Sequence, residues 1–193
     1  MRKEIFGFLV LLLLIASTYL LAKGEEKRGS DYIPSTAGVI QVTGLVERPY
    51  NITYDELSNL PSVDVNATLY CVDNPNTPRK RGIWRGVPLG YLIEKARPEN
   101  NALKVAVFAG DGYSTDFYLK DVIEDRSIIV AYELNGKPIT PRIVAPGRWG
   151  YKWLKEPVRI EITDENFLGT WERMGYPDDA VISSIKGKGG SSI

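Results

Sequence analysis

The residues that decide the fold are Val63 to Val72, VDVNATLYCV, where apolar and polar side chains alternate up to Cys71. A period of two over this length is typical of a β-strand with one buried face. The apolar set of this strand comprises Val63, Val65, Ala67, Leu69 and Cys71. The pattern therefore predicts that Cys71 faces inward, at the point where the strand ends.

The residues after this strand, Asp73 to Ile83, contain two prolines and the basic run Arg79-Lys80-Arg81, and we expect them to form a loop. A positive field stabilises a thiolate, which is the form of cysteine that ligates a metal. A single cysteine on an apolar strand face is more often a small buried hydrophobic residue. From these residues alone, both interpretations of Cys71 stay open.

The rest of the chain is also rich in strands. Further strands are predicted at 38–46, 103–109, 113–119, 128–134, 142–145 and 158–162. Asn135-Gly136 favours a tight hairpin turn between two of them.

Two short helices are predicted among these strands. Thr53 and Glu56 have the spacing of a capping box, and Pro61 should end the helix that they open. Pro88 should begin the other helix, with Leu89, Leu92, Ile93 and Ala96 on one face. Strands outnumber helices, so the expected fold class is α+β, with mixed β-sheets and a few short helices.

The composition excludes several kinds of site. The chain of 193 residues has no histidine and one cysteine, so a Ser-His-Asp triad, a common zinc site and an intrachain disulfide are all ruled out. The formal net charge is zero and the basic residues are dispersed, which argues against nucleic-acid binding. Any chemistry must use Cys71, carboxylates, tyrosines, basic side chains or a bound cofactor.

The N-terminus predicts export. Ile5 to Ala22 is an almost unbroken apolar run behind Arg2 and Lys3, long enough for a signal peptide or a membrane anchor. We expect the remainder to lie outside the cytoplasm, anchored or secreted. The predicted division is a leader or anchor at 1–23, a linker at 24–37, one domain at 38–180 and a frayed tail at 181–193.

A second basic segment runs from Arg142 to Lys155 around Gly147 and Gly150, and its other cations are Arg148 and Lys152. Backbone amides freed by glycine turns, together with Arg and Lys charges, can form a phosphate cradle. A solvated loop whose tryptophans pack on the core explains the same spacing equally well. The sequence leaves both interpretations open here.

Several short motifs follow one another in a recognisable order. After the strand that ends at Cys71 come Trp84-x-Gly86-Val-Pro-Leu89, Asp111-Gly112-Tyr113, Ala131-Tyr132-Glu133-Leu-Asn-Gly136, Arg142-Ile-Val-Ala-Pro-Gly147, Gly150-Tyr-Lys-Trp-Leu-Lys155 and an Ile160-Glu161 strand. Over roughly residues 38–180 this series resembles the oxidoreductase molybdopterin-binding domain of sulfite oxidases, eukaryotic nitrate reductases and the catalytic subunits of protein-methionine-sulfoxide reductases. Each motif is weak alone, and their common order carries the resemblance.

The resemblance implies a sulfite-oxidase-like fold that binds a molybdenum–molybdopterin cofactor. Cys71 matches the cysteine that ligates the metal. Arg142 and Lys155 match basic positions that hold the pterin or its phosphate, with Trp153 and Leu154 as neighbours, and Asn135 is the nearest match to a pterin-contacting residue. Arg148 and Lys152 join the cofactor-binding set through their spacing. Such sites carry out two-electron oxygen-atom transfer, which needs no histidine base.

Two hypotheses of different classes follow. The first is an extracytoplasmic molybdenum oxidoreductase that acts on a small oxyanion or sulfoxide. It would be tethered by its N-terminal segment and served by a separate haem- or quinone-linked electron partner, since the chain carries no haem or iron–sulfur motif. The alternative is an exported binding or interaction module that keeps the fold without the cofactor. The short 137–141 segment and the leader, which lacks a twin arginine, favour that alternative.

Overall fold

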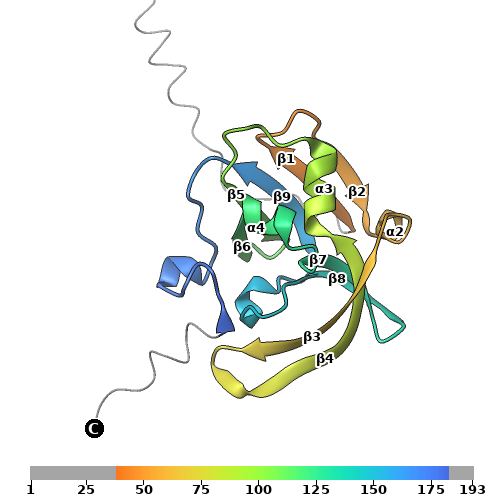
Figure 1. The fold of residues 1–193 in the computed structure, drawn as a ribbon, viewed down its shortest axis with the longest axis vertical. Helices are drawn as coiled ribbons and strands as arrows, with labels where there is room; N and C mark the ends of the chain where they lie inside the picture. Colours follow the sequence, from red (N-terminus) through yellow and green to blue (C-terminus); the bar gives the residue numbers. More distant parts are fainter. Residues whose placement is uncertain (1–37, 183–193) are drawn as a thin grey trace, which may run out of the picture. The chain divides into compact units, whose positions relative to one another are not determined.

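The structure, a computed structural model, describes residues 38–182 (Figure 1). The predicted membrane segment Ile5–Ala22 and the predicted linker 24–37 lie outside the described residues, as does most of the predicted tail. Within 38–182, no helix has the length and apolar character needed to cross a bilayer.

The first of two sheets is mixed. Its strand order is β2-β1-β9-β5-β6, in which β1 and β9 run parallel and the other neighbours antiparallel. The strands are β1 (Val39–Gly44), β2 (Tyr50–Thr53), β5 (Lys104–Ala109), β6 (Ser114–Tyr118) and β9 (Pro157–Thr163). The strands predicted at 38–46, 103–109, 113–119 and 158–162 are thereby confirmed.

The second sheet is antiparallel, with the order β3-β4-β7-β8. Its strands are β3 (Val63–Cys71), β4 (Asn74–Pro88), β7 (Ile129–Leu134) and β8 (Lys137–Val144). The predicted Asn135-Gly136 turn joins β7 to β8, and both residues have the positive φ of 51° and 73° that such a turn requires.

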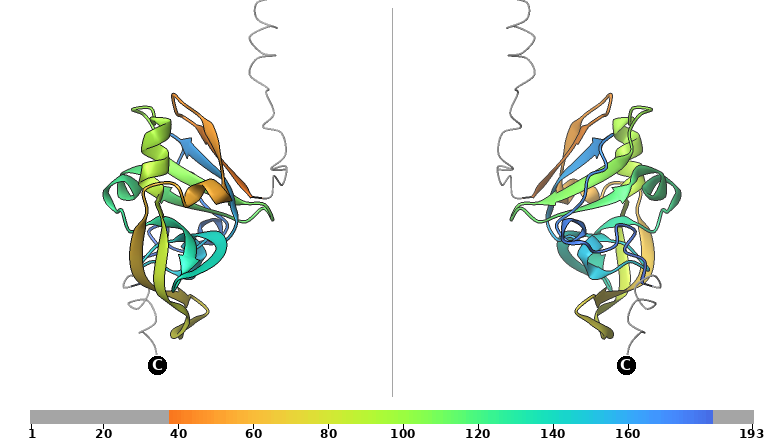
Figure 2. Two further views of the ribbon diagram at one scale, coloured as in Figure 1. Left: turned by 90° about the vertical axis from the view of Figure 1, so that its right-hand side faces the viewer. Right: turned by 90° about the vertical axis from the view of Figure 1, so that its left-hand side faces the viewer.

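The prediction of a loop at Asp73–Ile83 is wrong, because residues 74–83 make up most of the long strand β4. Pro75 and Pro78 misled the prediction, since proline is excluded from strands that have a neighbour on both sides. Up to Ile83, β4 pairs with β3 alone, and only from Trp84 onward does it also pair with β7. Prolines are tolerated on such a single-neighbour edge, and the tip of the β3–β4 hairpin extends beyond β7 and β8 (Figure 2).

The helices are short. The capping box is confirmed at α2 (Tyr54–Leu57), where the Thr53 amide donates to Glu56 Oε2 at 2.8 Å, although this helix ends well before Pro61. The predicted helix after Pro88 is α3 (Leu89–Ala96). The structure adds α4 (Leu119–Glu124) and two 3-10 turns, η1 (Gly150–Lys152) and η2 (Glu172–Met174). The predicted α+β class with mixed sheets is confirmed.

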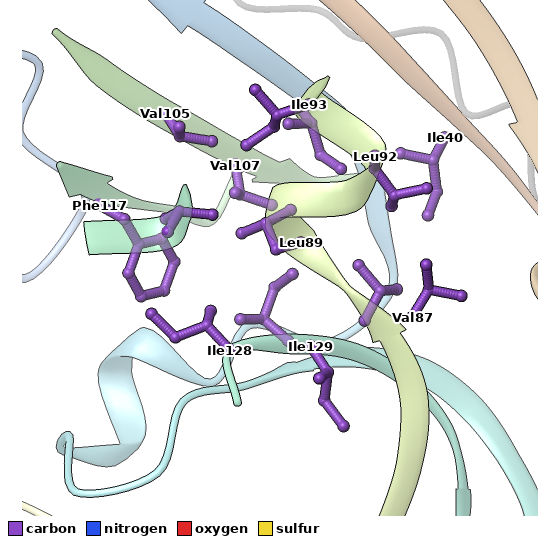
Figure 3. Close-up of a cluster of buried hydrophobic side chains, with 14 of the residues drawn as sticks. Ile40, Val87, Leu89, Leu92, Ile93, Val105, Val107, Phe117, Ile128 and Ile129 are labelled. Carbon is purple, nitrogen blue, oxygen red and sulfur yellow. The ribbon is translucent and has the colours of Figure 1, made fainter. Parts of the chain in front are cut away.

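The core forms where α3 packs on the first sheet and reaches the second. Leu89, Leu92 and Ile93 of α3 are fully buried and point toward side chains of both sheets, among them Val107 and Ile129 (Figure 3). This packing fixes the second sheet against the first, and with it the end of β3 that carries Cys71.

Candidate functional site

Cys71 is the last residue of β3, at a point where regular pairing with β4 breaks down. Its thiol is half-buried and lies 3.9 Å from Asp73 Oδ2. The predicted position at a strand end is confirmed. Cys71 is not packed into the core, however, because it opens onto a cavity together with its neighbours Leu69 and Val72.

This cavity, the Cys71 cavity, has a volume of about 300 Å³. It lies between the β3–β4 hairpin, the turn after β5, the end of β8 and the segment around η1. Its lining residues are Leu69, Cys71, Val72, Arg79, Tyr113, Arg142, Gly150, Tyr151, Trp153, Lys155 and Trp171. Three of them are cations and none is a carboxylate, so the cavity favours an anionic ligand.

Arg142 is the most buried of the three cations, with 6% of its surface exposed. Its Nη2 donates to the Trp153 carbonyl at 2.9 Å, and the guanidinium lies over the rings of Trp84 and Trp153. Burial lowers the pKa of Arg142, although an arginine stays charged in proteins. Among the described residues nothing accepts a hydrogen bond from its Nε. A buried donor without an acceptor is costly to the folded chain.

Lys155 is exposed, and the described residues offer it no ion-pair partner. It bridges to Arg142 through the backbone and lines the Cys71 cavity. It also lines a second cavity of about 450 Å³, with Asp111, Thr140 and Glu156 among the polar residues there. Lys155 therefore lines both cavities, and its charge has no ion-pair partner among the described residues.

Two of the predicted phosphate ligands point elsewhere. The fully buried Lys152 has its Nζ 2.6 Å from Glu172 Oε1 and 2.7 Å from the Asp116 carbonyl. Arg148 donates to the Asp179 carbonyl at 2.6 Å and pairs with Asp121. Carboxylates from distant parts of the chain hold these two side chains. Of the cations in this segment, Arg142 and Lys155 therefore line the cavity, whereas Arg148 and Lys152 stabilise the fold.

Asn135 and Leu154 also lie away from the cavity. The Asn135 side chain accepts a hydrogen bond from the Ile83 amide at 2.9 Å, so it joins two hairpins. Leu154 is buried in the core, and its carbonyl accepts from the Ile143 amide at 2.7 Å. Of the predicted set, Cys71, Arg142, Trp153 and Lys155 come together at the cavity.

An aromatic wall was missed by sequence reasoning. Tyr151 and Trp171 stack with centroids 6.1 Å apart, and the Tyr113 hydroxyl donates to the Tyr151 carbonyl at 2.7 Å. Burial raises the pKa of both tyrosines, so they are neutral phenols at ordinary pH. Asp111-Gly112-Tyr113 forms a turn in which Asp111 Oδ1 accepts a hydrogen bond from the Tyr113 amide at 2.9 Å, and Tyr113 lines the cavity. Trp171 carries no local signal that could have revealed it.

Metal chemistry at this cavity would need ligands beyond the described protein residues. Within residues 38–182 no group of three or more histidine, cysteine or acidic side chains is arranged to hold a metal ion. A metal bound to Cys71 would therefore take its remaining ligands from a cofactor, substrate or water. The cations that line the cavity suit a cofactor that carries negative charge.

Comparisons with known proteins point to one family. The family model described as "oxidoreductase molybdopterin binding domain" matches residues 35–171. The uncharacterized oxidoreductase YuiH of Bacillus subtilis is 32% identical over 151 residues, which cover 75% of each chain. The NADPH nitrate reductase of Beauveria bassiana is 31% identical and the NADH nitrate reductase of Solanum lycopersicum is 32% identical. These alignments cover 64% and 74% of this chain but only 17% and 19% of the enzymes.

Among solved structures, the sulfane dehydrogenase SoxCD of Paracoccus pantotrophus has a similar fold. It superimposes with a TM-score of 0.62 at 20% identity, over 74% of this chain and 42% of the SoxCD chain. At this identity the match speaks for the fold, and it agrees with the mixed-sheet architecture described above.

Proposed function

The chain belongs to the oxidoreductase molybdopterin-binding domain family, and on that premise we propose that it is an extracytoplasmic molybdenum-cofactor oxidoreductase. Its reaction would be two-electron oxygen-atom transfer on a small oxyanion or sulfoxide. The observation that carries this proposal is that Arg142, whose buried Nε has no acceptor among the described residues, lines the same cavity as Cys71. A thiol for a metal and a guanidinium for an anion are two features that a phosphate-bearing metal cofactor needs.

The chain's residues fit the cofactor in distinct roles. Cys71 would ligate the metal, and the three cations of the same cavity, Arg79, Arg142 and Lys155, would offset the negative charge of the bound cofactor. Arg142 and Lys155 would hold the anionic end, and because Lys155 lines both cavities, an elongated pterin could extend into the second one. When bound, the cofactor supplies the two-electron chemistry.

The remaining residues of the site would shape access to it. Tyr151, Trp153 and Trp171 form an apolar wall beside Cys71 that would limit the access of water to a bound cofactor. Arg79, on the exposed hairpin, would attract a negatively charged substrate toward the opening.

Electrons would come from or pass to a separate partner. The chain has one cysteine and no histidine, so it cannot hold an iron–sulfur cluster or a His-ligated haem of its own. The apolar run Ile5–Ala22 would tether the domain outside the cytoplasm, next to a haem- or quinone-linked partner. We keep the division into leader, linker, domain and tail as part of this proposal.

Metal and pterin content test the proposal. The full chain is produced in a molybdenum-replete host with an active cofactor pathway, and molybdenum and oxidised-pterin fluorescence are measured per chain. We expect both in the wild type, and a loss of retained molybdenum in Cys71→Ser with little change in stability. Arg126→Ala removes a surface ion pair with Glu94 and should load like the wild type. Wild-type protein without molybdenum or pterin would refute the proposal.

One observation favours the alternative, an exported binding or interaction module without a cofactor. Arg148 and Lys152 are engaged with protein acceptors, which leaves fewer cations for a phosphate than the sequence suggested. In that case Cys71→Ala would change stability slightly, and neither protein would contain metal. The same metal analysis therefore separates the two functions.

A further inference from the structure

We infer that the C-terminal strap, residues 164–182, positions the lining of the Cys71 cavity. It does so by binding the side chain of Lys152 on the side that faces away from the cavity. The strap follows β9 and includes η2. Its residues from Glu172 onward lie beyond the 35–171 range that the family model matches. The inference takes its chemical meaning from the proposed function, because the lining that is positioned would hold the cofactor.

The strap reaches Lys152 through a buried ion cluster, made of Lys104, Asp116, Lys152, Glu172 and Asp178. Lys152 Nζ lies 2.6 Å from Glu172, 3.3 Å from Asp116 Oδ1 and 3.6 Å from Asp178. Lys104 Nζ completes the cluster, 2.5 Å from Asp116 and 2.6 Å from Asp178. The side chains of both lysines and of Asp116 are fully buried. The strap carboxylates of Glu172 and Asp178 and the β6 carboxylate of Asp116 thus surround the same two lysines.

Buried charges of this kind fix geometry, since each ion has few acceptable positions away from water. Burial alone would lower the pKa of Lys104, but its hydrogen bonds to Asp116 and Asp178 outweigh burial and raise it. Lys104 therefore keeps its charge at neutral pH. If the strap moved away, Asp116 would be the one carboxylate of the cluster left to both lysines.

A second tether holds the neighbouring residue. The Tyr151 hydroxyl donates to the Pro177 carbonyl at 2.7 Å, and Trp171 of the strap stacks on the Tyr151 ring. Backbone bonds add to it, with the Trp149 amide donating to the Ala180 carbonyl at 2.9 Å. The strap therefore contacts two consecutive side chains of η1, Tyr151 and Lys152, and it also contributes Trp171 to the cavity wall.

Side chains alternate in direction along residues 151–155, and this alternation links the strap to the cavity lining. Tyr151, Trp153 and Lys155 line the Cys71 cavity, whereas Lys152 points away from it into the ion cluster. Fixing Lys152 sets the place of the Trp153 carbonyl, which in turn holds Arg142. Glu172 and Asp178 are thus positioning residues, and Lys152, predicted to bind phosphate, transmits their effect to the cations that face the cavity.

The test uses Cys71 as a reporter, since it is the only thiol in the chain. In the cofactor-free full chain, the rate of alkylation by iodoacetate, an anion, is divided by the rate with neutral iodoacetamide. We expect the cavity's cations to raise this ratio in the wild type, and Glu172→Gln to lower it by about threefold or more as they move. Glu161→Gln breaks a surface pair with Arg159 and should leave the ratio unchanged.

The molybdenum content of the folded protein gives an independent readout, and Glu172→Gln should reduce it while Glu161→Gln does not. A purely structural strap would lower resistance to urea but leave both the ratio and the loading of folded protein as in the wild type, which would overturn the inference. If the wild type carries no molybdenum, the proposed function fails, and the alkylation ratio alone decides on the strap.

A milder variant covers the case in which Glu172→Gln does not fold. Tyr151→Phe keeps the ring in the cavity wall and removes only the hydrogen bond to Pro177. A lowered alkylation ratio in this variant supports the positioning role of the strap, and an unchanged ratio contradicts it.

Discussion

Two basic regions meet at the Cys71 cavity, and they use their charges differently. The β3–β4 hairpin carries Arg79 on an exposed strand, and no carboxylate of the described residues pairs with it. The segment from Gly147 to Lys155 leaves Lys155 exposed at the cavity, but acceptors from β6, α4 and the strap hold its other two cations, Arg148 and Lys152. Both regions are equally basic in sequence, so charge alone does not say whether a cation binds ligand or holds the fold.

The difference has an energetic basis. An exposed cation contributes little to stability because water solvates it well in the folded and unfolded chain. A buried cation among carboxylates cannot be removed without leaving their charges uncompensated. We therefore expect substitutions on the hairpin to change ligand encounter, and substitutions in the ion cluster to change stability.

The largest effect should come from Lys152→Met. This change leaves Glu172 and Asp116 buried without their shared cation, and removing one partner of a buried ion pair costs about 3–5 kcal/mol. Urea unfolding measures the loss. Lys120→Met, on the exposed side of α4, is the matched control and should stay within about 0.5 kcal/mol of the wild type. Equal, small losses in both variants would show that the cluster does not stabilise the fold.

The next effect tests the contact between the two regions. Gly150 of η1 packs so closely on β3 that an added Cβ would lie 2.8 Å from the Tyr70 carbonyl oxygen. Because that obstacle is backbone, Gly150→Ala must push the hairpin away, at a cost of about 1–3 kcal/mol. Alkylation of Cys71 by iodoacetamide should become faster as the cavity opens. Gly110→Ala meets only Val158 at 3.7 Å, so neither its stability nor its alkylation rate should change comparably.

Local patterns were sufficient for most of the fold. The alternation in Val63–Cys71, the capping box at Thr53 and the Asn135-Gly136 turn each depend on residues close in sequence, and each is confirmed. The loop predicted at 73–83 failed because an edge strand tolerates prolines, and which strands lie at an edge is decided by the assembled sheet.

The site was less predictable for the same physical reason. The position of Cys71 at a strand end follows from strand periodicity, and the family motifs brought Arg142 and Lys155 to it. The orientation of Lys152 depends on Asp116 and Glu172, which are distant in sequence and have no spacing relation to it. Trp171 reaches the cavity only because the strap folds back. Contacts of this range have no local sequence signature.

The smallest effect on stability should come from Arg79→Ala. This change is also the sharpest test of the difference between the β3–β4 hairpin and the Gly147–Lys155 segment. Its side chain is exposed and unpaired among the described residues, so the free energy of unfolding should change by less than about 0.5 kcal/mol. The iodoacetate-to-iodoacetamide ratio at Cys71 should nevertheless fall, because one of the cavity's cations is lost. Raising the salt concentration should shrink the difference between variant and wild type, since salt screens exposed charges over about 10 Å at 0.1 M.

Arg81→Ala is the matched control for this change. Lys80 pairs with the cavity residue Leu69, and Arg81 pairs with Thr68, so the Arg81 side chain leaves the opposite face of the hairpin. Arg79 escapes this alternation because the pairing skips it, from Leu69 with Lys80 to Tyr70 with Pro78, and this bulge lets it line the cavity. If Arg79 acts by its place in the cavity, Arg81→Ala should leave the alkylation ratio close to that of the wild type. Equal falls in both variants would mean that the hairpin acts through its overall charge, and the assignment of Arg79 to the cavity would lose its support.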